Sequence, residues 1–226
     1  MNGATHKSDW ARLFKIACDL IRQVNADAPI IDYWTLGGGT AMMLQIVHRE
    51  SHDVDLFRND AQLLSFLSLD THDFAFEVAP AEHSGDGTGF LKLAFDGIGE
   101  IDFIVRQALT ESPTIEREIE GERTLLETVP EIITKKIVHR GASIRPRDIF
   151  DVAAGAEQYA DAIIGSLRAY PEAVQTTLKK MDQLNPDFVN RAIQALMIRD
   201  SFRSVSNSAI ERTKEILAAS LVGRGP

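Results

Sequence analysis

Residues 35–58 read TLGGGTAMMLQIVHRESHDVDLFR, and this stretch decides the fold. An apolar segment leads into three glycines and Thr40, a helix-like apolar segment follows, and the alternating segment DVDLF closes the stretch. The pattern predicts a strand, a glycine turn, a helix beginning near Thr40 and a second strand. Glycines between a strand and a helix let backbone N–H groups approach a phosphate, and the helix N-terminus adds favourable partial charge. The turn is therefore a candidate site for a triphosphate.

Two other nucleotide-binding patterns are excluded at this turn. A P-loop needs a lysine directly before its Ser or Thr, but Gly39 precedes Thr40. The dinucleotide-binding pattern GxGxxG is absent as well. A glycine turn required only for close packing remains the alternative.

Three aspartates are candidate metal ligands. In DVDLF, residues two apart share a strand face, so Asp53 and Asp55 project together while Val54 and Leu56 enter the core. Paired carboxylates repel unless a divalent cation bridges them, and Mg²⁺ binds a few carboxylates together with substrate phosphates. Asp102, in EIDFIV, completes a three-acid site for up to two metal ions if its strand lies beside the first. The alternative is that Asp53 and Asp55 are an exposed pair at a strand end without a function.

The pattern elsewhere divides the chain into a mixed α and β part and a helical part. The predicted elements are helices over 10–24 and 61–69, strands over 74–79, 90–95 and 100–105, a turn over 83–89, and helical segments 145–170, 171–184, 185–202 and 208–221. Another helix begins at Thr128, which forms a capping box with Glu131, and ends at Gly141. We therefore expect an α+β fold with a core domain over 1–125 and a helical domain over 126–226.

Composition limits the possible functions. An apolar fraction of 44% beside 25% charged residues indicates a folded globular chain. The net charge of −9 argues against a nonspecific nucleic-acid binder, so RNA contact would be local, for example at the basic run KKIVHRGASIRPR over 135–147. The only cysteine, Cys18, is expected to be buried. Residues 1–15 lack a signal-peptide pattern and no apolar run spans a membrane, which predicts a cytoplasmic protein without a membrane partner.

The order of these motifs resembles the AbiEii/AbiGii nucleotidyltransferase toxins of the DNA polymerase β-like superfamily. The likeness runs from about Gly37 to Val152, through GGGT, HRESHDVDLF, a carboxylate strand and KKIVHRGASIRPRDIFDV. It implies a polymerase β-like core with a mixed sheet, followed by a helical bundle. It also implies an enzyme that moves a nucleoside monophosphate from an NTP to an acceptor hydroxyl, with Mg²⁺ or Mn²⁺ as cofactor.

The resemblance extends the set of candidate site residues. The family's later motif, a Lys followed by Arg-Asp-x-x-Asp, falls on Lys136, Arg147, Asp148 and Asp151. Lys136 and Arg140 share a helix face that could meet phosphates, and Asp148 could orient either of them. As catalytic residues we expect Asp53, Asp55, Asp102, Lys136 and Asp148, with the first three as metal ligands. For nucleotide binding we expect Gly38, Gly39, Thr40, Arg49, Ser51, Arg140 and Arg147, whereas His48 and His52 are expected to be ordinary polar residues.

The acceptor is less well defined by the sequence. The resemblance implies RNA, in particular the 3′ end of tRNA, with growth arrest as the outcome and a separately encoded antitoxin as partner. A small molecule of the antibiotic type, a protein side chain, and a nucleotide-binding module without activity remain open. The helical part is shorter than in the longest family members, which bears on acceptor recognition, and the glycine run carries one additional Gly.

Overall fold

The computed structural model describes residues 8–222 and contains two compact units. The sheet unit comprises Met1–Ala41, Ser51–Ala108 and Ile115–Leu126, and the helical unit comprises Met42–Glu50, Leu109–Thr114 and Glu127–Pro226. The expected domain boundary at residue 125 stays a prediction. Two short segments from the first half of the chain belong to the helical unit. The prediction that residues 1–15 lack a signal-peptide pattern falls partly on residues 1–7, which lie outside the described residues. No helix within residues 8–222 is long and apolar enough to cross a membrane.

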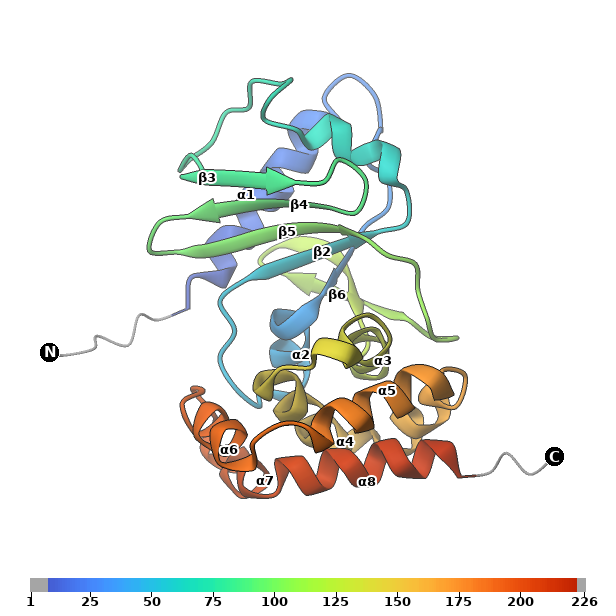
Figure 1. The fold of residues 1–226 in the computed structure, drawn as a ribbon. Coiled ribbons are helices and arrows are strands. Elements are labelled where there is room, and N and C mark those ends of the chain that lie inside the picture. The colour runs from blue at the N-terminus through green and yellow to red at the C-terminus, as the bar shows by residue number, and fades with distance from the viewer. Residues whose placement is uncertain (1–7, 223–226) are drawn as a thin grey trace, which may run out of the picture. The chain divides into compact units, whose positions relative to one another are not determined.

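A seven-stranded mixed sheet forms the centre of the sheet unit, in the order β3-β4-β5-β2-β1-β7-β6 (Figure 1). The strands are β1 Thr35–Gly37, β2 Val54–Arg58, β3 Glu82–Gly85, β4 Phe90–Phe95, β5 Gly99–Val105, β6 Thr114–Ile119 and β7 Glu122–Glu127. The β2–β5 and β1–β7 pairs are parallel, whereas β1–β2, β3–β4 and β4–β5 are antiparallel. The predicted strands over 90–95 and 100–105 and the mixed α+β class are confirmed.

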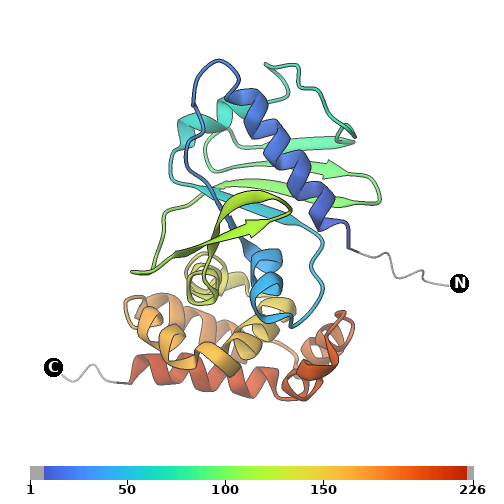
Figure 2. The same cartoon turned by 180° about the vertical axis from the view of Figure 1, so that it is seen from behind.

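One face of this sheet is apolar and packs against α1 (Trp10–Val24), which Figure 2 shows lying across the strands. Alternation places Val54 and Leu56 of β2 on that face, both essentially without exposed surface, as predicted. Helix α1 presents its own apolar stripe, and Cys18 within it is buried and free, so both predictions for this helix are confirmed. The predicted helix near 61–69 forms as the shorter 3-10 helix η1 (Ala61–Leu67).

One predicted strand was wrong and three observed strands were not predicted. Residues 74–79 form no strand, because Gln23 of α1 occupies the backbone N–H and C=O of Ala75. Strand β3 (Glu82–Gly85) overlaps the first part of the predicted turn over 83–89, and it is an edge strand whose residues are all exposed, so no apolar pattern marks it. Strands β6 and β7 were not predicted either.

The helical unit is built around α4, which packs against α3 and α8 (Figure 1). Its helices are α3 Val129–Arg140, α4 Pro146–Leu167, α5 Pro171–Asp182, α6 Pro186–Gln194, α7 Arg203–Asn207 and α8 Ala209–Leu221, with 3-10 helices η2 Gly141–Ser143 and η3 Asp200–Phe202. Proline in the first turn fixes where α3, α4, α5 and α6 begin. Helices α3, α4, α5 and α8 follow the predicted helical segments. The predicted segment 185–202 was wrong in its second half, because α6 ends at Gln194 and Ile198 forms an isolated β-bridge with Arg49, and α7 lies between the predicted segments.

The start of α3 differs from the predicted capping box. Thr128 is the N-cap and its hydroxyl accepts the Glu131 N–H at 3.4 Å, as expected. The Glu131 carboxylate accepts hydrogen bonds from the N–H groups of Leu109 and Thr110 and from the Thr110 hydroxyl. Glu131 therefore holds segment 109–114 within the helical unit.

Candidate functional site

Asp55 and Asp102 lie side by side in the sheet unit. They are Cα partners on the parallel strands β2 and β5, and partner residues project from the same face of a sheet. Their neighbours Val54, Leu56 and Ile101 are buried on the opposite face, the one that packs against α1. The strand register therefore brings two of the three predicted metal ligands together on the face away from α1.

The environment of Asp102 fits a cation site. Its side chain is 18% exposed, and its Oδ1 atom is buried without a hydrogen bond from any described residue. Burial and the nearby Asp55 carboxylate raise the pKa of Asp102 to about 6, against the lowering effect of Lys92, whose Nζ lies 3.4 Å from Oδ1. Two carboxylates that repel each other are stabilised by a bound divalent cation.

Asp53 lies outside this carboxylate pair. It precedes the first residue of β2, and its Oδ1 accepts the Glu100 N–H at 3.3 Å. Within residues 8–222, no group of three or more His, Cys, Asp or Glu side chains is arranged to hold a metal ion. Mg²⁺ commonly takes one or two carboxylates and completes its coordination shell with phosphates and water. The carboxylates of Asp55 and Asp102 match Mg²⁺ in number and in the type of ligand atom. The role of Asp53 as a third ligand stays a prediction.

The glycine turn lies directly against Asp55. Helix α2 (Gly38–Ile46) begins two residues earlier than predicted, with Gly38 at φ +65°. A Cβ atom at Gly38 would lie 1.8 Å from Asp55 Oδ2, so only glycine leaves room for the carboxylate. The Thr40 hydroxyl is buried and donates to the Asp53 carbonyl at 2.5 Å, which ties the turn to the residue before β2. The first turn of α2 and the Asp55 carboxylate therefore form one site.

We expect Gly38→Ala to reduce both stability and nucleotidyl transfer. The new Cβ must displace the Asp55 carboxylate and also forces alanine into a left-handed backbone conformation. Gly97→Ala is the matched control, since Gly97 has φ +70° but a Cβ atom added to it would meet nothing within 4 Å. In urea unfolding, Gly97→Ala should cost about 1 kcal/mol and Gly38→Ala at least about 2 kcal/mol. Equal costs would contradict the proposed contact between Gly38 and Asp55.

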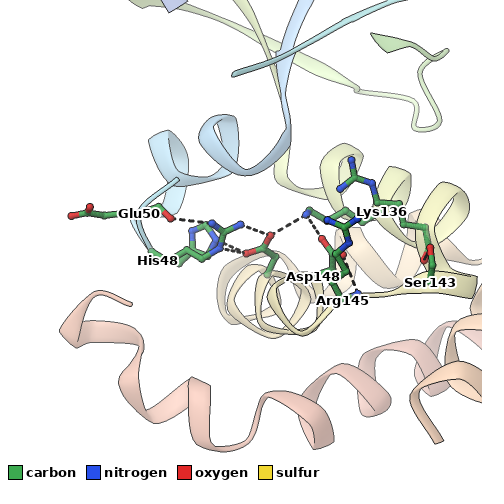
Figure 3. A network of polar contacts seen from close by, with 9 residues as sticks. His48, Glu50, Lys136, Ser143, Arg145 and Asp148 are labelled. Carbon is green, nitrogen blue, oxygen red and sulfur yellow. Dashed lines mark hydrogen bonds and ion pairs between the residues drawn. The ribbon is translucent and has the colours of Figure 1, made fainter. Parts of the chain in front are cut away.

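The helical unit contains a second cluster of charged side chains, centred on Asp151 of α4. Figure 3 shows its labelled members His48, Lys136 and Asp148. Arg49 donates to Asp151 through Nε at 2.7 Å and Nη2 at 2.9 Å. His48 Nε2 lies 2.9 Å from Asp151 Oδ1, and Lys136 Nζ lies 3.0 Å from Oδ2. Burial by itself would raise the pKa of Asp151, but Arg49 and Lys136 outweigh it and hold that pKa well below its ordinary value. Asp151 is therefore a buried carboxylate that three partners keep charged.

Lys136 joins Asp151 to Asp148, the other aspartate of the motif. Its Nζ lies 2.6 Å from Asp148 Oδ1, and Asp148 Oδ2 accepts the Arg145 N–H at 3.2 Å in the first turn of α4. Of the two partners left open for Asp148, Lys136 and Arg140, the ion pair forms with Lys136. Burial opposes ionisation of Asp148, but Lys136 outweighs it and the pKa of Asp148 is lowered. Lys136 is only 8% exposed, so both of its ion pairs are shielded from solvent.

The basic run over 135–147 does not form one exposed surface, which corrects the sequence prediction. Lys135 is buried and pairs with Glu127 at 2.5 Å and Glu131 at 3.4 Å, and Lys136 is buried as described above. Of the remaining bases, His139 and Arg145 are exposed, whereas Arg140 and Arg147 are half-buried. The two lysines stabilise the helical unit, and the catalytic and nucleotide-binding roles of Lys136, Asp148, Arg140 and Arg147 stay predictions.

The structure places three further residues of the sequence analysis, and the nucleotide-binding roles of Arg49 and Ser51 stay predictions. Arg49 was predicted to touch phosphate beside the metal strand, but its hydrogen bonds go to Asp151 and to the Glu50 carbonyl. Ser51 is buried, and its carbonyl accepts the Ser8 hydroxyl at 2.5 Å. His48 was expected to be an ordinary polar residue, yet it is fully buried against Asp151. Partners more than 100 residues apart leave no local signal, so this cluster could not be found from spacing.

The fold and the site define a class of enzyme. A mixed sheet with a glycine turn at a helix start, and two in-register acids on neighbouring strands, agrees with the nucleotidyltransferase core that the sequence resemblance implies. The sequence model of the nucleotidyl transferase AbiEii toxin family, of a type IV toxin–antitoxin system, matches residues 19–218. The chain belongs to this family and is a nucleotidyltransferase toxin.

Two solved structures are similar to this chain, and the likeness to MenT4 supports the fold. MenT4, the nucleotidyltransferase toxin Rv2826c from Mycobacterium tuberculosis H37Rv, is 14% identical with a TM-score of 0.54, covering 97% of this chain and 87% of that chain. JHP933 from Helicobacter pylori is 17% identical with a TM-score of 0.46, covering 94% of this chain and 92% of that chain. The sequence matches no curated protein.

Proposed function

We propose that this toxin uses a divalent metal, Mg²⁺ in the first place, to transfer a nucleoside monophosphate from an NTP to the 3′ end of tRNA or another RNA. The observation that carries the proposal is the in-register pair Asp55 and Asp102, with Asp55 packed against Gly38 at the start of α2. Carboxylates that share a metal ion, next to a helix N-terminus that favours phosphate, are the elements that nucleotidyl transfer needs. A separately encoded antitoxin is the proposed partner.

Each part of the site has a role in this proposal. Asp55 and Asp102 would hold the metal, which supplies positive charge for the triphosphate and the leaving pyrophosphate. The backbone N–H groups at the start of α2 would bind phosphate oxygens, and Gly38 leaves room for the Asp55 carboxylate beside them. Thr40 fixes the turn through its bond to the Asp53 carbonyl, so the turn and β2 keep their spacing. The chain thereby positions the NTP before any acceptor arrives.

The RNA acceptor is supported by the family's toxin character and by the chemistry of the substrates. An NTP and tRNA are both cytoplasmic, which agrees with the location expected from the sequence. The exposed Arg145 and the half-buried Arg140 and Arg147 offer local positive charge in a chain whose net charge is −9. This surface is smaller than the whole basic run, because Lys135 and Lys136 are buried.

The test is transfer of label from each α-³²P-labelled NTP in turn to total tRNA in the presence of Mg²⁺. The Asp55→Asn variant serves as the blank for contaminating activity. Periodate-oxidised tRNA, which lacks a reactive 3′-terminal hydroxyl, tests the position of transfer. We expect label on intact tRNA with the wild-type protein only, and none on oxidised tRNA.

Other outcomes would change the proposal in defined ways. Equal labelling of oxidised tRNA would contradict the 3′ end as acceptor. Pyrophosphate release without labelled RNA would contradict the RNA acceptor and point to a protein or small molecule. If the protein binds NTP and metal but releases no pyrophosphate with tRNA, small molecules or protein acceptors, the assignment of activity fails.

A further inference from the structure

A row of partner residues crosses the carboxylate face of the sheet unit. The β-sheet register aligns Ser84, Lys92, Asp102, Asp55 and Gly37 on five neighbouring strands. Neighbouring strands are about 4.8 Å apart, so a lysine stem reaches across one strand. Asp102 therefore lies between Asp55 on one neighbouring strand and Lys92 on the other.

Lys92 is the counter-charge of this row in the structure. Its Nζ forms an ion pair with Glu100 and lies 3.4 Å from Asp102 Oδ1, the buried oxygen that accepts no hydrogen bond from a described residue. The Lys92 side chain is 32% exposed, so the ammonium group can leave these carboxylates without unfolding the sheet. It occupies the position next to Asp102 that a cation would seek.

We propose that Lys92 is the internal counter-cation of Asp102, that a metal ion replaces it there, and that the released ammonium binds the phosphates of the NTP. This inference rests on the proposed function, because it takes Asp102 as a metal ligand. Its consequence is that metal and NTP bind together, while either one alone binds more weakly.

Charge supports this exchange. Asp55, Asp102 and Glu100 bring three carboxylates to one side of the sheet, and Lys92 is paired with two of them. Two cations on one carboxylate oxygen repel, so binding of a metal ion at Asp102 weakens the hold on Lys92. A lysine ammonium is a compact charge on a flexible stem and binds phosphate readily. A bound triphosphate would therefore replace the carboxylates as the negative partner of Lys92. If Lys92 only formed a surface ion pair, its removal would leave metal affinity unchanged.

The test is calorimetric titration with Mn²⁺, with and without a non-hydrolysable NTP analogue. Lys92→Met removes the ammonium and keeps the stem, and Lys92→Arg keeps the charge. Lys15→Met is the control, since Lys15 forms an exposed ion pair with Glu120 and the change in net charge is the same. Lys92→Met should bind Mn²⁺ alone roughly tenfold more tightly than the wild type, and the analogue with Mn²⁺ roughly tenfold more weakly. Lys15→Met should change neither affinity, and Lys92→Arg should remain close to the wild type.

The outcomes separate this inference from the proposed function. Unchanged Mn²⁺ affinity in Lys92→Met, or unchanged affinity for the analogue, overturns the role of Lys92. Adding Asp55→Asn to the wild type and to Lys92→Met should abolish the binding of Mn²⁺ in both. If Mn²⁺ binding survives Asp55→Asn, the metal assignment fails and the inference fails with it. If Asp55→Asn abolishes binding while Lys92→Met has no effect, the proposed function stands and only the exchange is refuted.

Discussion

Asp55→Asn is expected to lower kcat/KM for nucleotidyl transfer by roughly 10³-fold while the protein remains folded. Asparagine keeps the shape of the side chain that packs against Gly38 but removes one of the two in-register charges that would hold the metal. Stability should change little or rise, because Asp55 raises the pKa of Asp102 by repulsion and the substitution removes that repulsion. A loss of activity together with unchanged unfolding is therefore the expected signature.

Asp96→Asn provides the matched control for this variant. Asp96 is exposed in the turn between β4 and β5, and the substitution makes the same change in charge. Steady-state rates with labelled NTP and urea unfolding should be measured for both variants beside the wild type. The metal assignment is refuted if Asp55→Asn keeps more than about a tenth of wild-type activity.

Asp151→Asn is expected to lower the free energy of unfolding by about 3–5 kcal/mol. The substitution removes the charge that Arg49 and Lys136 share inside the helical unit, and it leaves Asp148 as the remaining buried carboxylate beside Lys136. The asparagine amide can accept hydrogen bonds, but it carries no negative charge to balance the positive charge of the buried Arg49 guanidinium. Breaking one member of a buried ionic network costs far more than losing an exposed pair.

Asp161→Asn, also on α4 but exposed, is the control and should change stability by less than about 0.5 kcal/mol. Chemical unfolding of both variants measures the difference. Similar costs for the two variants would show that the cluster around Asp151 adds no stability.

The pH dependence gives Asp151→Asn a second readout. The pKa values of Asp148 and Asp151 are lowered in the folded protein, so the unfolded chain takes up protons first as the pH falls. Their stabilising contribution is complete above the ordinary aspartate pKa near 4 and is lost as the pH falls further through the folded values. The stability difference between wild type and Asp151→Asn should therefore be constant from about pH 7 to 5 and shrink below about pH 4. A difference that grows in acid would contradict this sign.

Local patterns were enough to identify much of the candidate site. The glycine turn, the alternation in DVDLF and the strand around Asp102 each depend on a few neighbouring residues, and backbone geometry fixes which side chains share a face. The family resemblance placed Lys136 and Asp148 in one motif and left Lys136 and Arg140 open as partners of Asp148, and packing decided for Lys136. Strands β3, β6 and β7 were not predicted; in β3 every residue is exposed, so this edge strand has no apolar pattern of its own.

The sequence by itself determined the α+β class, the family, and the acids that project from β2 and β5, because these follow from periodicity and motif order. Only the tertiary structure decided which acids meet. The strand register aligns Asp55 with Asp102 and Lys92 and leaves Asp53 beside Glu100. It also decided that Lys136 and Arg49 are buried around Asp151, since residues from separate segments of the chain meet only when the helices pack. A charge in the sequence has no fixed role until packing sets its partners and its access to water.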